Sequence, residues 1–337
     1  MKTTALMQYA GAMAALAILS ACGGASAVAP STPALNVTYI GRTLSLNGRP
    51  VTAARLSALP TYATMLPEAK KSKDYEYVIN DYGSYASIFN YPKSTKQIGT
   101  INDVGGQGCT DAFYGYGKKI VWIVAGQTQI EEFQVPSKAL KTLSVNYSFP
   151  SSCAMDSSGD LAVGILYASG AGGGDVVIFK NASGSGKAYS TPLDEEFFDG
   201  YDPQGDLFAD GFTGDRSNFA LVGLLKGSTK FVTIKTSNSP TFPGSVQWDG
   251  TYLTVFDQLA NDIYQYTVSG TTATLKGTVS LSGAGDCAQT WIVKGLVYCG
   301  DAGNDGGEIY KYPAGGSPIA VFSGNFDVPL GMTAAKK

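Results

Sequence analysis

The chain has 337 residues, of which 15% are charged and 42 are glycine, and its formal net charge is −3 with no histidine. With fewer basic than acidic residues, the composition does not indicate a basic surface that would bind nucleic acid. The absence of histidine removes Ser–His and Cys–His nucleophile pairs, histidine bases and histidine metal ligands. Low charge with abundant glycine and tyrosine favours strands and tight turns over helices.

The first residues predict an export signal. Lys2 precedes an apolar run from about Ala10 to Leu19, which is too short to span a bilayer. The run ends in Leu-Ser-Ala-Cys at 19–22, which resembles the lipobox of bacterial lipoproteins. An ordinary secretory peptide, cut a few residues later, is the alternative.

The lipobox resemblance implies that residues 1–21 are a signal peptide and that Cys22 becomes the acylated N-terminus. Three acyl chains would hold the protein stably, because stable anchoring needs more than one chain. Gly23 stands where Asp would hint at retention in the inner membrane. We therefore expect a lipid-anchored protein of the cell envelope, at the outer membrane or cell surface.

The next segment, residues 22–70, reads as the lipidated cysteine and a flexible tether. It begins with small, polar and proline-containing sequence, which is typical of a linker. Asn47-Gly48 within it is compatible with a short hairpin.

From Asp74 onward the sequence repeats. Six short apolar strands follow one another at intervals of 42, 47, 44, 42 and 46 residues. Their first apolar residues are Ile88, Ile130, Val177, Leu221, Ile263 and Ile309. Three of these strands end in the related sequences "IFNYP", "EFQVP" and "IYKYP", and proline there ends a strand because it cannot donate to the ladder.

A second marker lies earlier in each unit, in a strand that precedes an Asp-containing turn. The equivalent residues are Cys109, Cys153, Asp199, Val246, Cys287 and Met332. A period near 44 residues with about four strands per unit is typical of a β-propeller. We predict an all-β, six-bladed propeller over residues 71–337.

The two ends of this region complement each other. Residues 330–335 match the first strand of a unit, whereas the unit that begins at Asp74 lacks one. We therefore expect the C-terminal strand to complete the first blade, which leaves no open seam between the first and last blades.

The stretches "YVINDYGSYASIFNYP" and "VYCGDAGNDGGEIYKYP" resemble NHL-type repeats, and residues 74–337 resemble a gluconolactonase-like propeller. The chain is also similar to uncharacterised bacterial lipoproteins with "MLPEAK" before the first blade, here 65–70. The gluconolactonase resemblance implies a divalent ion held by inner-strand oxygens. Here the two candidate rings of inner-strand residues supply one carboxylate each, Asp199 and Asp286, whereas Ca²⁺ takes six to eight oxygens.

The densest acidic and aromatic stretch is "LDEEFFDGYD", residues 193–202. We name as candidate axial or ligand-binding residues Glu195, Glu196, Asp199, Tyr201 and Asp286. Such residues at a propeller mouth suit a cation or a sugar-like ligand. The alternative is a solvated acidic loop whose phenylalanines belong to the core.

Four cysteines follow Cys22 in a chain that we expect to be exported, where disulfides form. The turn "MDSSGDL" would set Cys153 opposite Gly164, and the equivalent pair in the last blade is Cys287 and Cys299, for which we predict a disulfide. Cys109 and Cys153 hold matching positions on neighbouring blades, a less obvious geometry for a bridge; whether they are free or bonded stays open.

These observations favour a monomeric, non-catalytic propeller that binds an envelope protein or a small ligand, without a predicted cofactor. The alternative is a Ca²⁺-dependent hydrolase or lactonase with an atypical axial site, and a purely structural role is a third reading. Propellers host hydrolases, lyases, binders and scaffolds alike, so the fold does not choose among them.

Overall fold

The computed structural model describes residues 44–46, 49–51, 64–65, 74–80, 85–105, 108–110, 120–125, 128–145, 149–166, 174–214 and 217–336. The chain divides into two compact units, Met1–Pro60 and Thr61–Lys337. In the first unit β1 (Leu44–Leu46) pairs antiparallel with β2 (Arg49–Val51), the hairpin with which the Asn-Gly dipeptide is compatible. The expected signal peptide and Cys22 lie outside the described residues.

The second unit is built of β-strands throughout its described residues, apart from one 3-10 turn, η2 (Lys180–Ala182). Three of its sheets are four-stranded antiparallel meanders. They hold β7 (Gly108–Thr110), β8 (Ile120–Ala125), β9 (Gln129–Gln134) and β10 (Lys138–Ser144); β11 (Pro150–Met155), β12 (Leu161–Ile165), β13 (Asp175–Phe179) and β14 (Lys187–Ser190); and β23 (Cys287–Val293), β24 (Leu296–Asp301), β25 (Gly306–Lys311) and β26 (Gly315–Phe322).

An eight-stranded sheet contains two further antiparallel meanders. They are β15 (Glu195–Tyr201), β16 (Leu207–Thr213), β17 (Asn218–Leu224) and β18 (Val232–Thr236), and β19 (Val246–Trp248), β20 (Leu253–Asp257), β21 (Asp262–Ser269) and β22 (Thr272–Ser280). Their outermost strands, β18 and β22, join in parallel through Lys235↔Thr272 and Thr236↔Ala273.

The last sheet joins the two ends of the unit. It runs in the order β27 (Pro329–Lys336), β4 (Asp74–Asn80), β5 (Tyr85–Asn90), β6 (Ser94–Asn102) and β3 (Thr64–Met65). Met332 lies opposite Val78 in the β27–β4 ladder, so the predicted pairing of the C-terminal strand with the first unit is confirmed. Strand β3, which pairs with β6, was not expected, since it falls within the predicted tether.

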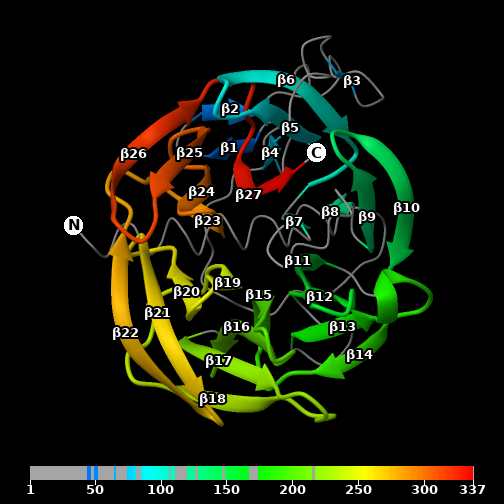
Figure 1. The fold of residues 1–337 in the computed structure, drawn as a ribbon, viewed down its shortest axis with the longest axis vertical. Helices are drawn as coiled ribbons and strands as arrows, with labels where there is room; N and C mark the ends of the chain where they lie inside the picture. Colours follow the sequence, from blue (N-terminus) through cyan, green and yellow to red (C-terminus); the bar gives the residue numbers. More distant parts are fainter. Residues whose placement is uncertain are drawn as a thin grey trace. The chain divides into compact units, whose positions relative to one another are not determined.

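The sheets of Thr61–Lys337 surround a common centre in a propeller-like arrangement (Figure 1). The strands nearest the centre, called the inner strands below, are β7, β11, β15, β19, β23 and β27. Each of the sequence markers from Cys109 to Met332 falls on one of them, and each marker from Ile88 to Ile309 falls on the third strand of its meander. The repeat therefore predicted the strand order of every meander. In the three proline-containing repeats the Tyr91–Pro92, Val135–Pro136 and Tyr312–Pro313 peptide bonds are cis.

The predicted register of Cys153 is wrong by one residue. Cys153 lies opposite Val163, and Ser152 lies opposite Gly164. The reason is the turn, in which the N–H of Asp156 donates to Asp160 O at 3.0 Å, so five residues separate the strands. In the last meander only Lys294-Gly295 separates β23 from β24, so positions in the two hairpins are not equivalent.

Both cysteine pairs are bonded. Cys287 and Cys299 form the predicted disulfide, although a bulge between Cys287 and Thr290, not a shared rung, brings them together. Cys109 and Cys153 form a second disulfide, with Cα atoms 5.7 Å apart. This bond joins the neighbouring inner strands β7 and β11, because the matching positions there face each other closely enough for a bridge.

Amide side chains join other inner strands. Gln247 of β19 donates to Ile292 O at 2.9 Å and accepts from Ile292 N–H at 2.7 Å. Gln289 of β23 makes the same pair of bonds with Gly108 of β7, at 2.7 and 3.1 Å. Each of these paired hydrogen bonds, called an amide clamp below, satisfies one buried backbone N–H and one buried backbone C=O.

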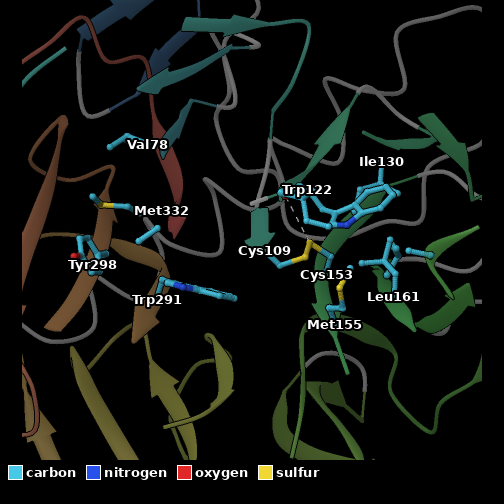
Figure 2. Close-up of a cluster of buried hydrophobic side chains, with 14 of the residues drawn as sticks. Val78, Cys109, Trp122, Ile130, Cys153, Met155, Leu161, Trp291, Tyr298 and Met332 are labelled. Atoms are coloured by element: carbon cyan, nitrogen blue, oxygen red, sulfur yellow. Dashed lines mark hydrogen bonds between the residues drawn. A yellow bond between two sulfur atoms is a disulfide. The ribbon is translucent and has the colours of Figure 1, made fainter. Parts of the chain in front are cut away.

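A large apolar cluster packs around the first disulfide and extends to β23 and β27. Figure 2 shows Trp122, Met155 and Leu161 near the Cys109–Cys153 bond, and the same cluster contains Trp291, Tyr298 and Met332. Its members come from strands far apart in sequence, as a ring of sheets requires. No helix in the described part of the chain has the length and apolarity needed to cross a membrane.

Candidate functional site

The acidic and aromatic stretch forms the inner strand β15, and all seven of its residues are buried. Phe197 packs against Phe212 and Phe242 with ring centroids 5.5 and 5.8 Å apart, at near-perpendicular angles. The phenylalanines therefore belong to the core, as expected, but the reading of the segment as a solvated acidic loop is wrong.

Two carboxyl groups of β15 meet two serines of β11. Ser151 Oγ donates to Glu196 Oε2 at 2.8 Å. Ser152 Oγ lies 3.1 Å from Asp199 Oδ1 and 3.4 Å from Glu196 Oε1. The hydroxyl of Ser152 thus lies between the two carboxyl groups, and the group of Ser151, Ser152, Glu196 and Asp199 is called the carboxyl–serine cluster below.

Two glycines make room for this cluster. A Cβ atom at Gly164 of β12 would collide with Glu196 Oε2 and Ser152 Oγ, and one at Gly174 would collide with the backbone and Cβ of Glu196. Since these clashes involve backbone or a buried carboxyl group, they are not relieved by moving a flexible side chain. The space for the Glu196 carboxyl depends on the absence of a side chain at Gly164, and the space for the Glu196 backbone depends on its absence at Gly174.

Asp210 of the neighbouring strand β16 adds a third buried carboxyl group. Its Oδ2 accepts from Gly244 N–H at 3.0 Å. Its Oδ1 and the Oδ2 of Asp199 are buried without a hydrogen-bond partner. Glu196 and Asp210 are 0% exposed and Asp199 is 4% exposed, and within the described residues no lysine or arginine forms an ion pair with any of the three.

Burial changes the acidity of all three groups. It raises the pKa of Asp199 to about 7, against the effect of the Ser152 hydrogen bond. It raises the pKa of Glu196 well above its ordinary range, and the nearby Asp199 adds to that increase. The pKa of Asp210 is likewise raised by burial, against hydrogen bonds from the backbone of Gly244 and Phe198. Removing a carboxylate from water without a cation favours its neutral form.

The other predicted site residues lie apart from this cluster or serve the fold. Glu195 begins β15 opposite Phe212. Tyr201 ends the same strand, and burial, followed by the charges of Asp156 and Asp199, raises its pKa. Asp286 precedes β23, and its N–H donates to Asp301 Oδ1 at 2.8 Å. The structure thus brings Glu196 and Asp199 together and places Asp286 in a different network.

The acidic turn before β25 is held by Asp301. Its carboxylate accepts from the backbone N–H groups of Gly285, Asp286 and Asn304 at 2.7 to 3.0 Å. This capping role explains the carboxylate without a bound ion, because a buried carboxylate is stabilised by several N–H donors.

The described residues contain one group of three cysteine or carboxylate ligand atoms within 4.8 Å of one another, which is Cys287, Cys299 and Asp301. Both of its cysteines are in a disulfide, so they offer no thiolate, the form that binds metals. Glu196, Asp199 and Asp210 do not form such a group. One oxygen from each of these three acids therefore does not fall within 4.8 Å of the other two.

Sequence reasoning missed Ser151, Ser152 and Asp210 as partners of β15. Asp210 stands in the apolar strand sequence "LFADGFT", where an unpaired carboxyl is uncommon, so the strand itself carried a signal. The serines carried none, because hydroxyl residues are frequent throughout this chain and only the packing of β11 on β15 selects them.

No protein-family model matches the sequence, and no curated protein is significantly similar to it in sequence. In structure, the chain is similar to a chain of a crystal structure of a nidogen/laminin complex, with a TM-score of 0.61 and 12% sequence identity. The match covers 78% of this chain and 98% of the other. At this identity the likeness shows a shared propeller-like fold and nothing about activity.

Proposed function

We propose that this protein is a non-catalytic, six-bladed β-propeller that binds another protein at the cell envelope. Six blades follow from counting each meander in the eight-stranded sheet as one blade and the β27–β4–β5–β6 meander as another. A general β-propeller role in binding or scaffolding is compatible with the fold, and the choice of a protein partner rests on the arguments below.

One observation carries the non-catalytic part of the proposal. The acids with raised pKa values on the inner strand β15 and its neighbour β16, which are Glu196, Asp199 and Asp210, are at most 4% exposed. A general acid or base must come within hydrogen-bond reach of the substrate atom whose proton it moves. Groups enclosed between β11, β15 and β16 do not meet a substrate in solution.

The partner class is supported by the fold neighbour. The similar chain comes from a complex named for nidogen and laminin, so a propeller of this kind is found in a protein–protein assembly. A rigid ring with two faces of turns suits such binding, because binding residues are often on loops that a rigid scaffold positions.

The membrane attachment is proposed from the sequence at Cys22. The chain would carry its lipid there, followed by a tether that ends before β3 and by a monomeric propeller. Labelling cells with an alkyne fatty acid should mark the wild-type protein and not Cys22→Ser. Label on both proteins, or on neither, would contradict lipidation at Cys22.

Photo-crosslinking tests the binding role. A photoreactive amino acid is placed at the exposed Gln204 or the exposed Ser217, which lie in turns at opposite ends of β16. We expect one of the two positions to crosslink a defined envelope protein, which then binds the purified propeller saturably and in a defined ratio. Crosslinks without saturable binding of the purified partner would contradict the proposal.

An activity screen tests the alternative. Lactone and ester hydrolysis is measured with and without Ca²⁺, Mn²⁺ and Zn²⁺, on the wild type and on Asp199→Ala. We expect no turnover in either protein. Metal-stimulated turnover that Asp199→Ala abolishes would establish the hydrolase reading instead.

A further inference from the structure

The junction between β11 and β15 is unlike the other inner-strand junctions for which contacts are known. A disulfide joins β7 to β11, and amide side chains join β19 to β23 and β23 to β7. Neither a disulfide nor an amide changes charge between pH 4 and 9. The serine hydroxyls of β11 instead meet the carboxyl groups of Glu196 and Asp199, and Ser151 Oγ makes one longer contact, at 3.4 Å, with the backbone oxygen of Glu196.

We propose that Glu196 and Asp199 form a proton-binding pair that holds β11 against β15, so that this junction is tight when the pair is protonated and opens when both groups are ionised. The proposal is independent of the partner-binding function above. It concerns a contact between two strands of the fold whose strength depends on pH.

The geometry supplies the first argument. Ser152 Oγ is within hydrogen-bond distance of both carboxyl groups, yet a hydroxyl has one proton to donate. With both acids ionised, one of them loses that donor while it stays buried. With one acid protonated, its own O–H supplies the missing donor.

The unpartnered oxygens supply the second argument. Asp199 Oδ2 has no hydrogen-bond partner although it is buried, and burying an ionised carboxylate without partners costs far more than burying a neutral acid. Because the Glu196 carboxyl lies against Gly164 and the Glu196 backbone lies against Gly174, we expect the carboxyl to reach solvent only if β11 or β15 moves.

The surroundings add further negative charge and no cation among the described residues. Asp210 on β16 acts on Glu196, Asp199 acts on Tyr201, and Asp257 on β20 acts on Asp210. Glu195 precedes Glu196 on β15, and Asp175 of β13 follows Gly174, which lies against the Glu196 backbone. Deprotonating the pair therefore places like charges close together in a dry interior, which is unfavourable.

The sign of the pH effect follows from the raised pKa values. Burial raises the pKa of Asp199 to about 7 and that of Glu196 in the same direction, whereas both groups titrate near pH 4 in an unfolded chain. Between about pH 4 and pH 7 the folded protein therefore binds more protons than the unfolded protein does. Stability conferred by the pair is complete below about pH 4 and is lost as the pH rises through about 7.

Hydrogen–deuterium exchange tests this on the whole protein. We expect protection of peptides covering 150–155 and 195–201 to fall by about tenfold or more between pH 5.5 and pH 8, after correction for the intrinsic exchange rate, since each pKa unit is worth a factor of ten. A peptide covering 287–293, held by amide clamps, should not change. In Glu196→Gln and Asp199→Asn, which keep the side-chain shape, we expect the pH dependence to disappear, and in the exposed control Asp305→Asn to persist.

Infrared spectroscopy provides a second readout that needs no folded variant. At pH 6 the wild type should show the C=O stretch of protonated carboxylic acids, and the intensity of that band should fall as the pH rises through about 7. Absence of that band at pH 6, or an unchanged pH dependence of exchange in the variants, would overturn the proposal. Restored protection at pH 8 on adding Ca²⁺, lost in Asp199→Asn, would also overturn it by identifying a cation as the occupant.

Discussion

Gln289 reaches from β23 to Gly108 of β7 and hydrogen-bonds both backbone groups of that glycine, although 181 residues separate the two. The inner strand β27 packs against both β23 and β7. The clamp therefore ties together the two neighbours of the strand that the C-terminus contributes, and it is placed to resist opening of the ring there.

Replacing Gln289 with alanine should destabilise the protein by about 1–3 kcal/mol, because it leaves the N–H and C=O of Gly108 buried without partners. Urea denaturation at pH 6 measures this. The exposed Gln204→Ala is the matched control and should shift the free energy of unfolding by less than about 0.5 kcal/mol. Equal effects of the two substitutions would show that the clamp contributes nothing specific.

Deleting residues 328–337 should give an insoluble or unfolded product. The deletion removes β27, exposes the edge of β4 and uncovers Val78, which packs opposite Met332. Deleting 336–337 keeps the rungs from Pro329 to Ala335 and serves as the control. Circular dichroism melting distinguishes the two, and a cooperative transition of the longer deletion at the parent temperature would refute closure by β27.

The two disulfides should stabilise the fold to different extents. Cys109–Cys153 closes a sequence separation of 44 residues and Cys287–Cys299 one of 12. By chain entropy the first is worth about 4 kcal/mol and the second about 3 kcal/mol. Paired Cys→Ser substitutions compared by denaturant unfolding measure the difference.

Peptide mapping without reduction checks the pairing itself. We expect both cross-linked peptides in protein produced under oxidising conditions. Free thiols at Cys109 and Cys153 would contradict the bond between β7 and β11, and a mixed pairing such as Cys109 with Cys287 would contradict the ring order.

Substituting Gly164 with alanine should destabilise the protein by about 1–3 kcal/mol, the usual cost of overpacking a filled interior. The new Cβ would collide with Glu196 Oε2 and Ser152 Oγ. Gly306→Ala is a matched control in a buried strand, since its Cβ would meet only Asn304 O at 3.7 Å. Thermal unfolding measures the stability of both variants. A Gly164→Ala protein as stable as the wild type would show that the carboxyl–serine cluster has room for another methyl group.

The sequence by itself determined the repeat, and with it the order of the strands. Alternating apolar residues at intervals near 44, with Asp–Gly turns between them, are local signals, and a strand or turn depends mainly on its own residues. The sequence also showed that the first unit lacks its first strand and that the C-terminus supplies one, so counting strands predicted the pairing of β27 with β4. The Cys287–Cys299 disulfide was predicted as well, although from a register that does not occur.

Only the tertiary structure decided how the inner strands meet. Five residues, Asp156–Asp160, connect β11 to β12, whereas two residues, Lys294-Gly295, connect β23 to β24. The length of the turn sets which residues of a hairpin lie opposite each other, and the bulge between Cys287 and Thr290 shifts that register once more. Contacts such as Cys109–Cys153, Gln289–Gly108 and Ser152–Asp199 join segments from different units. No local pattern encodes them, because each depends on the distance and rotation between neighbouring sheets, and burial of the β15 carboxyl groups follows from that packing.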